Sequence, residues 1–125
     1  MVRLHPKNEI QEFSAYQEEV DAFSEGGDPL ELVWAADLVV GMTSMLLTEA
    51  SLLERPTLAI LPRASEAMWL PNTASGITPV ASTREQLQSL LRELTAGYQA
   101  PAADRLFLFG AMERLVGFIS MQLNG

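Results

Sequence analysis

Two short apolar runs on either side of one helix-like segment constrain the fold of this chain more than any other feature. The runs DLVVG (37–41) and TLAIL (57–61) lack the alternation of apolar and polar residues that half-exposed strands show. Strands of this kind occur in parallel sheets that are covered on both faces. The segment 44–54 between the runs favours a helix, which stops before Pro56. The sequence therefore predicts a β-α-β unit.

Further strands and helices are expected on both sides of this unit. Toward the N-terminus we expect a short strand at 2–5, an acidic helix at 9–23 and a short helix at 29–35. Toward the C-terminus we expect a long loop at 63–76, a strand at 77–81, an amphipathic helix at 83–97 and a final apolar helix at 103–123. We therefore predict a single α/β domain over residues 1–125. It is Rossmann-like and three-layered, with helices flanking a short parallel sheet of about four strands.

Composition and charge exclude several classes of function. The net charge of −8 repels phosphate backbones and anionic lipids, so we expect no nucleic-acid binding. The absence of cysteine excludes disulfides and thiol catalysis, and one histidine with scattered carboxylates predicts no metal site. The apolar runs are too short to cross a bilayer, and the first residues do not form a signal peptide. We therefore expect a cytoplasmic protein without a transmembrane segment.

The end of the run DLVVG is the first candidate binding site. Gly41, Thr43 and Ser44 lie where the predicted strand gives way to the predicted helix. Ligands of open parallel sheets bind at the carboxyl ends of the strands. A small residue permits close approach to the backbone, and hydroxyl and amide groups at a helix start favour a phosphate. The simpler interpretation, that Gly41 forms a turn and Ser44 caps the helix, stays open at this point.

Glu49 is the second candidate. A helical wheel with about 100° per residue groups four polar residues on one arc, namely Ser44, Thr48, Ser51 and Arg55. Glu49 lies off this arc, and its neighbours one turn away are all large and apolar, namely Met45, Leu46, Leu52 and Leu53. A carboxylate in such surroundings is costly unless something binds it. We expect either a buried, internally paired carboxylate or one that faces a cleft and accepts hydrogen bonds from a ligand hydroxyl.

The stretch 36–62, ADLVVGMTSMLLTEASLLERPTLAILP, resembles the C-terminal, donor-binding domain of GT-B-fold glycosyltransferases. It is similar also to the related UDP-N-acetylglucosamine 2-epimerases. In these families a strand ending in Gly leads to a hydroxyl- or Gly-rich turn, a helix with a Glu-Ala pair, a turn ending in Pro and a strand ending in Pro. Glu49-Ala50, Arg55-Pro56 and Leu61-Pro62 occupy those positions. The segment RLHPK (3–7) looks like the strand ending in His-Pro that these families place beside the donor site.

The resemblance implies a site and a partner. Thr43 and Ser44 would hold the pyrophosphate of the donor, Glu49 would bind its ribose hydroxyls, and Gly41 and His5 would belong to the same donor site. The substrate would be a nucleotide-diphospho-sugar, with no other cofactor. The chain would be half of a GT-B architecture, the fragment of a larger protein whose N-terminal acceptor domain is the missing partner. In full, that protein would be a glycosyltransferase of surface polysaccharide or glycolipid biosynthesis, peripheral to the inner membrane.

Two other functions remain open. One is an epimerase-like isomerase fragment, although the turn Met42–Met45 departs from the Asp-Ser-Gly-Gly of the epimerases. The other is a non-catalytic α/β interaction module. In GT-B enzymes the catalytic base usually comes from the other domain, so we predict no catalytic residue here and little activity for the fragment alone. Apolar surface exposed where a partner domain is absent would favour self-association.

Overall fold

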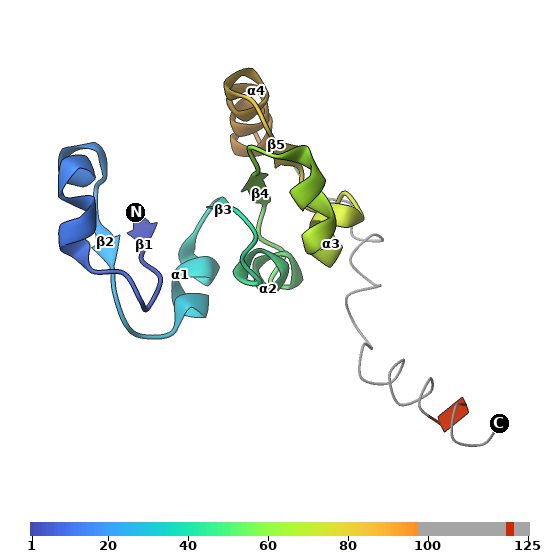
Figure 1. The fold of residues 1–125 in the computed structure, drawn as a ribbon, viewed down its shortest axis with the longest axis horizontal. Coiled ribbons are helices and arrows are strands. Elements are labelled where there is room, and N and C mark those ends of the chain that lie inside the picture. The colour runs from blue at the N-terminus through green and yellow to red at the C-terminus, as the bar shows by residue number, and fades with distance from the viewer. Residues whose placement is uncertain (98–119, 122–125) are drawn as a thin grey trace.

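A computed structural model describes residues 1–97 and 120–121, and in that part of the chain strands and helices alternate (Figure 1). In chain order the elements are β1 (Val2–Arg3), η1 (Ile10–Glu19, a 3-10 helix), β2 (Phe23–Ser24), α1 (Pro29–Ala35), β3 (Val39–Gly41), α2 (Leu46–Leu52), β4 (Thr57–Ile60), η2 (Ala64–Trp69, also 3-10), α3 (Pro71–Ala74), β5 (Val80–Ala81) and α4 (Arg84–Thr95). β1 pairs with β2, β3 with β4, and β4 with β5, and each pair is parallel. The predicted α/β class with parallel pairing is confirmed.

The strands of the described residues form two sheets, whereas the sequence predicted one sheet of about four strands. β1 and β2 make one sheet, and the order in the other is β3-β4-β5. The prediction of a helix over 9–23 was wrong at its end, because η1 stops at Glu19 and β2 follows. β2 contains two residues, too few to show any periodicity. Its pairing with β1 and the packing of Phe23 on Phe13, with ring centroids 6.2 Å apart, hold it in place.

The three-stranded sheet carries apolar clusters on both of its faces. Adjacent strand residues point to opposite faces, so Leu58 and Ala59 of β4 enter different clusters. Ala59 packs with Leu47 of α2 and with residues at η2 and α3, whereas Leu58 packs with the leucines of α4. β4 is therefore buried as predicted. β3 is not fully covered, because it lies at the edge of the sheet and Val40 remains 44% exposed.

Side-chain caps begin two of the helices. The Asp28 carboxylate accepts a hydrogen bond from the Leu30 amide at 2.9 Å, and Pro29 is the first residue of α1. Thr83 accepts from the Gln86 amide at 3.2 Å, while the Gln86 side chain accepts from the Thr83 amide at 3.2 Å. This reciprocal pair is a capping box and starts α4.

The prediction of a long loop over 63–76 was wrong. η2 and α3 lie there, and Pro71 is the first residue of α3, a position that suits its fixed φ and missing N–H group. The Thr73 hydroxyl donates to the carbonyls of Ala67 and Leu70 and joins the two elements. The strand predicted over 77–81 is shorter, at Val80–Ala81. The final helix predicted over 103–123 falls outside the described residues, except for Ser120 and Met121.

Buried polar side chains connect α2, β4 and α3. Thr48 of α2 donates to the Asn72 carbonyl oxygen at 2.8 Å, and the Asn72 amide donates to the Thr78 hydroxyl at 2.6 Å. Thr78 is 2.6 Å from the Thr57 hydroxyl, and the Ser51 hydroxyl, 3.4 Å from Thr57, donates to a backbone carbonyl of its own helix. All five residues are buried. The polar arc of the predicted helix therefore faces the interior at Thr48 and Ser51.

Candidate functional site

A cavity of about 820 Å³ lies between β1 and β3. Its walls come from residues 1–6, from Gly27 and α1 with Ala36, from 38–41, and from Ser44, Leu46 and Glu49. We call it the β1–β3 cavity. Most of its wall residues are apolar, and the polar side chains among them are few, namely Arg3, His5, Ser44 and Glu49. A concave, largely apolar space with a few polar groups is the usual form of a small-molecule site.

Four of the five residues proposed from the sequence line this cavity. His5 follows β1, Gly41 ends β3, and Ser44 and Glu49 lie before and within α2. They gather because β1 and β3 both end beside the same space. Thr43 is half-buried in the same turn but is not among the residues that form the wall.

Ser44 has a local structural role. Its hydroxyl accepts a hydrogen bond from the Leu46 amide at 3.2 Å, and its carbonyl accepts from the Leu47 amide at 3.1 Å. The first amides of α2 are thus used within the turn, but Met45, not Ser44, is the N-cap residue of α2, and no side chain caps this helix. The hydroxyl lies at the surface and keeps its own proton for a second partner.

The surroundings predicted for Glu49 were wrong. Its side chain is exposed, Met45 beside it is 56% exposed, and Leu46, Leu52 and Leu53 are only partly buried. The helical wheel separates the two sides of α2 correctly, but the side with Thr48 and Ser51 is the one that packs inward. No burial cost therefore demands a partner for Glu49. Glu49 instead lines the β1–β3 cavity, and a position facing a cleft was one of the two that the sequence left open for it.

His5 is exposed and is held by a local bond. Its Nδ1 accepts a hydrogen bond from the Lys7 amide at 3.2 Å. In a neutral imidazole whose Nδ1 is an acceptor, the proton is on Nε2. His5 can therefore offer one N–H group to a ligand in the cavity.

Arg3 belongs to the cavity wall and was missed from the sequence. Its guanidinium donates to the Ser24 hydroxyl at 3.0 Å, to the Gly27 carbonyl at 2.9 Å and to the Gly26 carbonyl. Gly26 and Gly27 have φ of +66° and +69°, a conformation that favours glycine. In the sequence the glycine pair lies between the two helices expected over 9–23 and 29–35. Its contact with Arg3 joins residues 23 positions and more apart, which no local pattern reveals.

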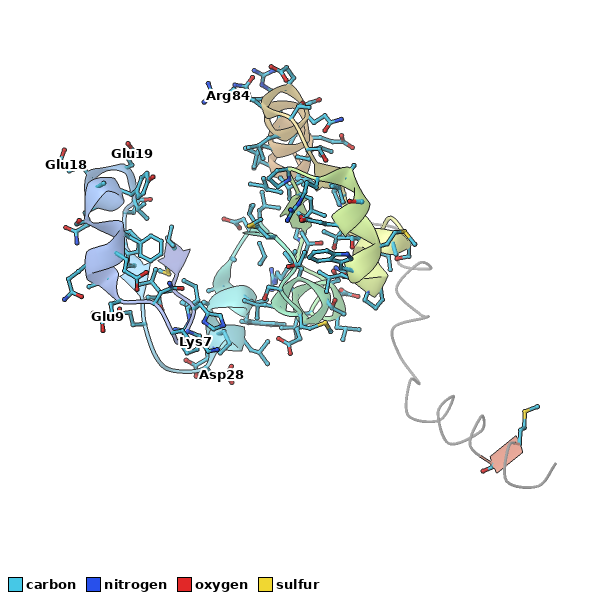
Figure 2. All side chains as sticks on the ribbon, viewed as in Figure 1. Lys7, Glu9, Glu18, Glu19, Asp28 and Arg84 are labelled. Atoms are coloured by element: carbon cyan, nitrogen blue, oxygen red, sulfur yellow. The ribbon has the colours of Figure 1, made fainter. Side chains whose placement is uncertain are left out.

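The charges on the cavity wall nearly balance. Arg3 and Glu49 are its charged side chains, and Arg3 is engaged with three acceptors. Much of the acidity of the chain is elsewhere, because Glu9, Glu18 and Glu19 project outward from the N-terminal segment (Figure 2).

Comparison of the chain with protein-family models, with curated proteins and with solved structures finds no match. Within residues 1–97 and 120–121, no helix is long and apolar enough to cross a membrane. The same part of the chain contains no group of three or more potential metal-binding side chains.

Proposed function

We propose that the β1–β3 cavity is the donor site of a GT-B-type glycosyltransferase and binds a nucleotide-diphospho-sugar. The observation that supports this most is the gathering of His5, Gly41, Ser44 and Glu49 around one cavity at the carboxyl ends of β1 and β3. The chemistry of these residues and the family resemblance both point to these positions in the sequence. Parallel strands with helices on both faces of the larger sheet are compatible with the Rossmann-like half of such an enzyme.

The proposed binding mode assigns each polar group a part of the donor. The diphosphate lies at the turn 41–44, beside Gly41 at the end of β3, and the Ser44 hydroxyl donates to a phosphate oxygen. The Glu49 carboxylate accepts hydrogen bonds from the ribose hydroxyls, and His5 donates from Nε2. Such donors stabilise the charge on a departing diphosphate without a metal ion. The acceptor domain of the parent protein supplies the catalytic base, in a transfer that builds a surface polysaccharide or glycolipid.

Replacement of Glu49 by Gln is expected to weaken nucleotide binding at least tenfold, because hydrogen bonds to a charged group contribute about 1.5–3 kcal/mol. Isothermal titration of the chain with UDP, GDP, CDP and TDP measures this effect. Glu93→Gln on α4, also an exposed helical carboxylate, is the matched control and should bind as the unchanged chain does. Equal affinity of both variants would remove Glu49 from the site. Failure of all four nucleotides to bind the folded chain would contradict the donor site itself.

Replacement of Ser44 by Asp is expected to weaken nucleotide binding more than tenfold and to leave the free energy of unfolding nearly unchanged. An Asp side chain can accept the hydrogen bond of the Leu46 amide as the Ser44 hydroxyl does, but its charge repels a diphosphate. Ser44→Asn, a neutral acceptor of the same shape as Asp, is the control and should retain most of the affinity. Thermal unfolding measured beside the titration confirms that both variants fold. Equal affinities for Asp and Asn would place the diphosphate elsewhere.

Exposed apolar side chains favour a second candidate function, the non-catalytic interaction module. Val40, Met42 and Met45 lie in and beside β3 and α2 and are 44%, 54% and 56% exposed. Such side chains suit contact with another protein or a second copy of the chain better than contact with a diphosphate. This function predicts concentration-dependent association in sedimentation experiments and no nucleotide binding.

A further inference from the structure

Arg3 is the positively charged side chain in the wall of the β1–β3 cavity, and neutral acceptors hold its guanidinium in place. Nη1 donates to the Ser24 hydroxyl at 3.0 Å and to the Gly26 carbonyl, and Nη2 donates to the Gly27 carbonyl at 2.9 Å. Gly27 belongs to the same wall. Two carbonyls and a hydroxyl therefore orient the side chain, but none of them balances its positive charge.

Two N–H groups of Arg3 remain for another partner. A guanidinium has five N–H groups, of which Nη1 here uses two and Nη2 uses one. Within residues 1–97 and 120–121, the Nε proton and the second Nη2 proton bond to no acceptor. In the same part of the chain, Arg55 Nε is the one buried side-chain nitrogen or oxygen without a partner, so Arg3 Nε is open to solvent.

These two donors suit an oxyanion. Neighbouring N–H groups of one guanidinium bind two oxygens of a carboxylate or phosphate through parallel hydrogen bonds. Because three acceptors already fix the Arg3 side chain, it has little conformational freedom left to lose when it binds a ligand. The wall of the cavity thus contains an oriented site for an anionic group.

The position of Arg3 indicates which anionic group of a donor it would meet. In the proposed binding mode the diphosphate lies at the turn 41–44, which follows β3, and the ribose lies at Glu49. Arg3 belongs to β1, the strand on the other side of the cavity. The remaining parts of the donor are the base, which is uncharged, and the sugar. A sugar presents a carboxylate when it is a uronic acid.

We propose that Arg3 binds the carboxylate of the donor sugar, so that the donor is the nucleotide-diphospho derivative of a hexuronic acid. This inference rests on the proposed function. Nε and Nη2 each donate one hydrogen bond to the carboxylate. A neutral hexose leaves both donors to water, and the site therefore selects the acidic sugar.

Isothermal titration with UDP-glucuronate and UDP-glucose tests this proposal, because the two ligands differ only in the carboxylate or hydroxymethyl group of the sugar. We expect the unchanged chain to bind UDP-glucuronate at least tenfold more tightly, although its net charge of −8 opposes a further negative charge. Arg3→Gln should remove this preference, so that the two affinities become nearly equal. Arg92→Gln on α4, which also replaces an exposed arginine, is the matched control and should keep the preference.

The ratio of the two affinities separates carboxylate binding from a structural role of Arg3. If Arg3 only supports the Gly26–Gly27 turn, or binds the diphosphate, then Arg3→Gln weakens both ligands equally, and the proposal is overturned. Equal affinities of the unchanged chain for the two ligands would overturn it without any variant, while binding of both would still support the donor site.

Free glucuronate and glucose, titrated by NMR into the unchanged chain and the Arg3→Gln variant, keep the test independent of the nucleotide. If neither sugar nucleotide binds but glucuronate does, and only when Arg3 is present, the carboxylate site is supported and the proposed function is contradicted. Failure of both glucuronate and UDP-glucuronate to bind the folded chain would overturn the carboxylate site.

Discussion

Replacing Asn72 by Ala is expected to lower the free energy of unfolding by about 3 kcal/mol, a large part of the stability of a domain of this size. Asn72 is completely buried and links Thr48 of α2 to Thr78. The substitution leaves the Thr48 hydroxyl without its acceptor and the Thr78 hydroxyl without a donor, both in the interior. A buried polar group that loses its partner costs about 1–3 kcal/mol.

Denaturant unfolding followed by circular dichroism measures this change through the transition midpoint at constant slope. Asn8→Ala is the matched control, because the Asn8 amide donates to Glu12 at the surface, at 3.2 Å. Its expected effect is within about 0.5 kcal/mol. If the two alanine variants lose similar stability, then the buried network contributes nothing beyond an ordinary surface bond.

The elements predicted correctly are those with a local chemical cause. DLVVG and TLAIL contain β3 and β4 because an uninterrupted apolar run of this length favours a strand, although only β4 is covered as such a run predicts. The caps of α1 and α4 also have a local cause, because each bonds to an amide two or three residues later.

The elements that were missed depend on contacts between distant residues. β2 exists through its pairing with β1, some twenty residues earlier in the chain. The segment 63–76 has no clear hydrophobic period, yet η2 and α3 form there, and Asn72 and Thr73 of α3 are buried through bonds to Thr48, Thr78 and the end of η2. The sequence shows these polar residues but not their partners.

In the candidate site, too, the features with a local cause were predicted and those that depend on distant contacts were not. The position of Gly41 and Ser44 at the end of a strand followed from the β-α-β pattern, and the cavity does lie there. A helical wheel showed that Glu49 and Thr48 face different ways but not which of them faces the interior. Arg3 could not be selected, because its role depends on the fold of the Gly26–Gly27 turn.

Replacing Leu47 by Ala is expected to lower the free energy of unfolding by about 3–5 kcal/mol, the range for a leucine whose removal leaves a cavity. Leu47 is 1% exposed and packs with Ala59, Leu61 and Leu70 under α2. It also supports the candidate site, because a side-chain carbon built on Gly41 would lie 3.4 Å from the Leu47 Cγ. The empty space would therefore open directly beneath the turn that ends β3.

Leu47→Met and Leu30→Ala are the controls for this variant. Methionine keeps the volume and should cost less than about 1.5 kcal/mol, and Leu30 is 37% exposed, so its truncation should cost less than about 1 kcal/mol. Thermal unfolding and UDP titration are measured on all three below the transition of the weakest. If Leu47→Ala weakens UDP binding while Leu47→Met and Leu30→Ala preserve it, then core packing sets the geometry of the turn. Unchanged affinity in a destabilised Leu47→Ala variant would mean that the turn keeps its shape without the leucine beneath it. The hydrogen bonds of Ser44 to Leu46 and Leu47 would then be sufficient to hold it.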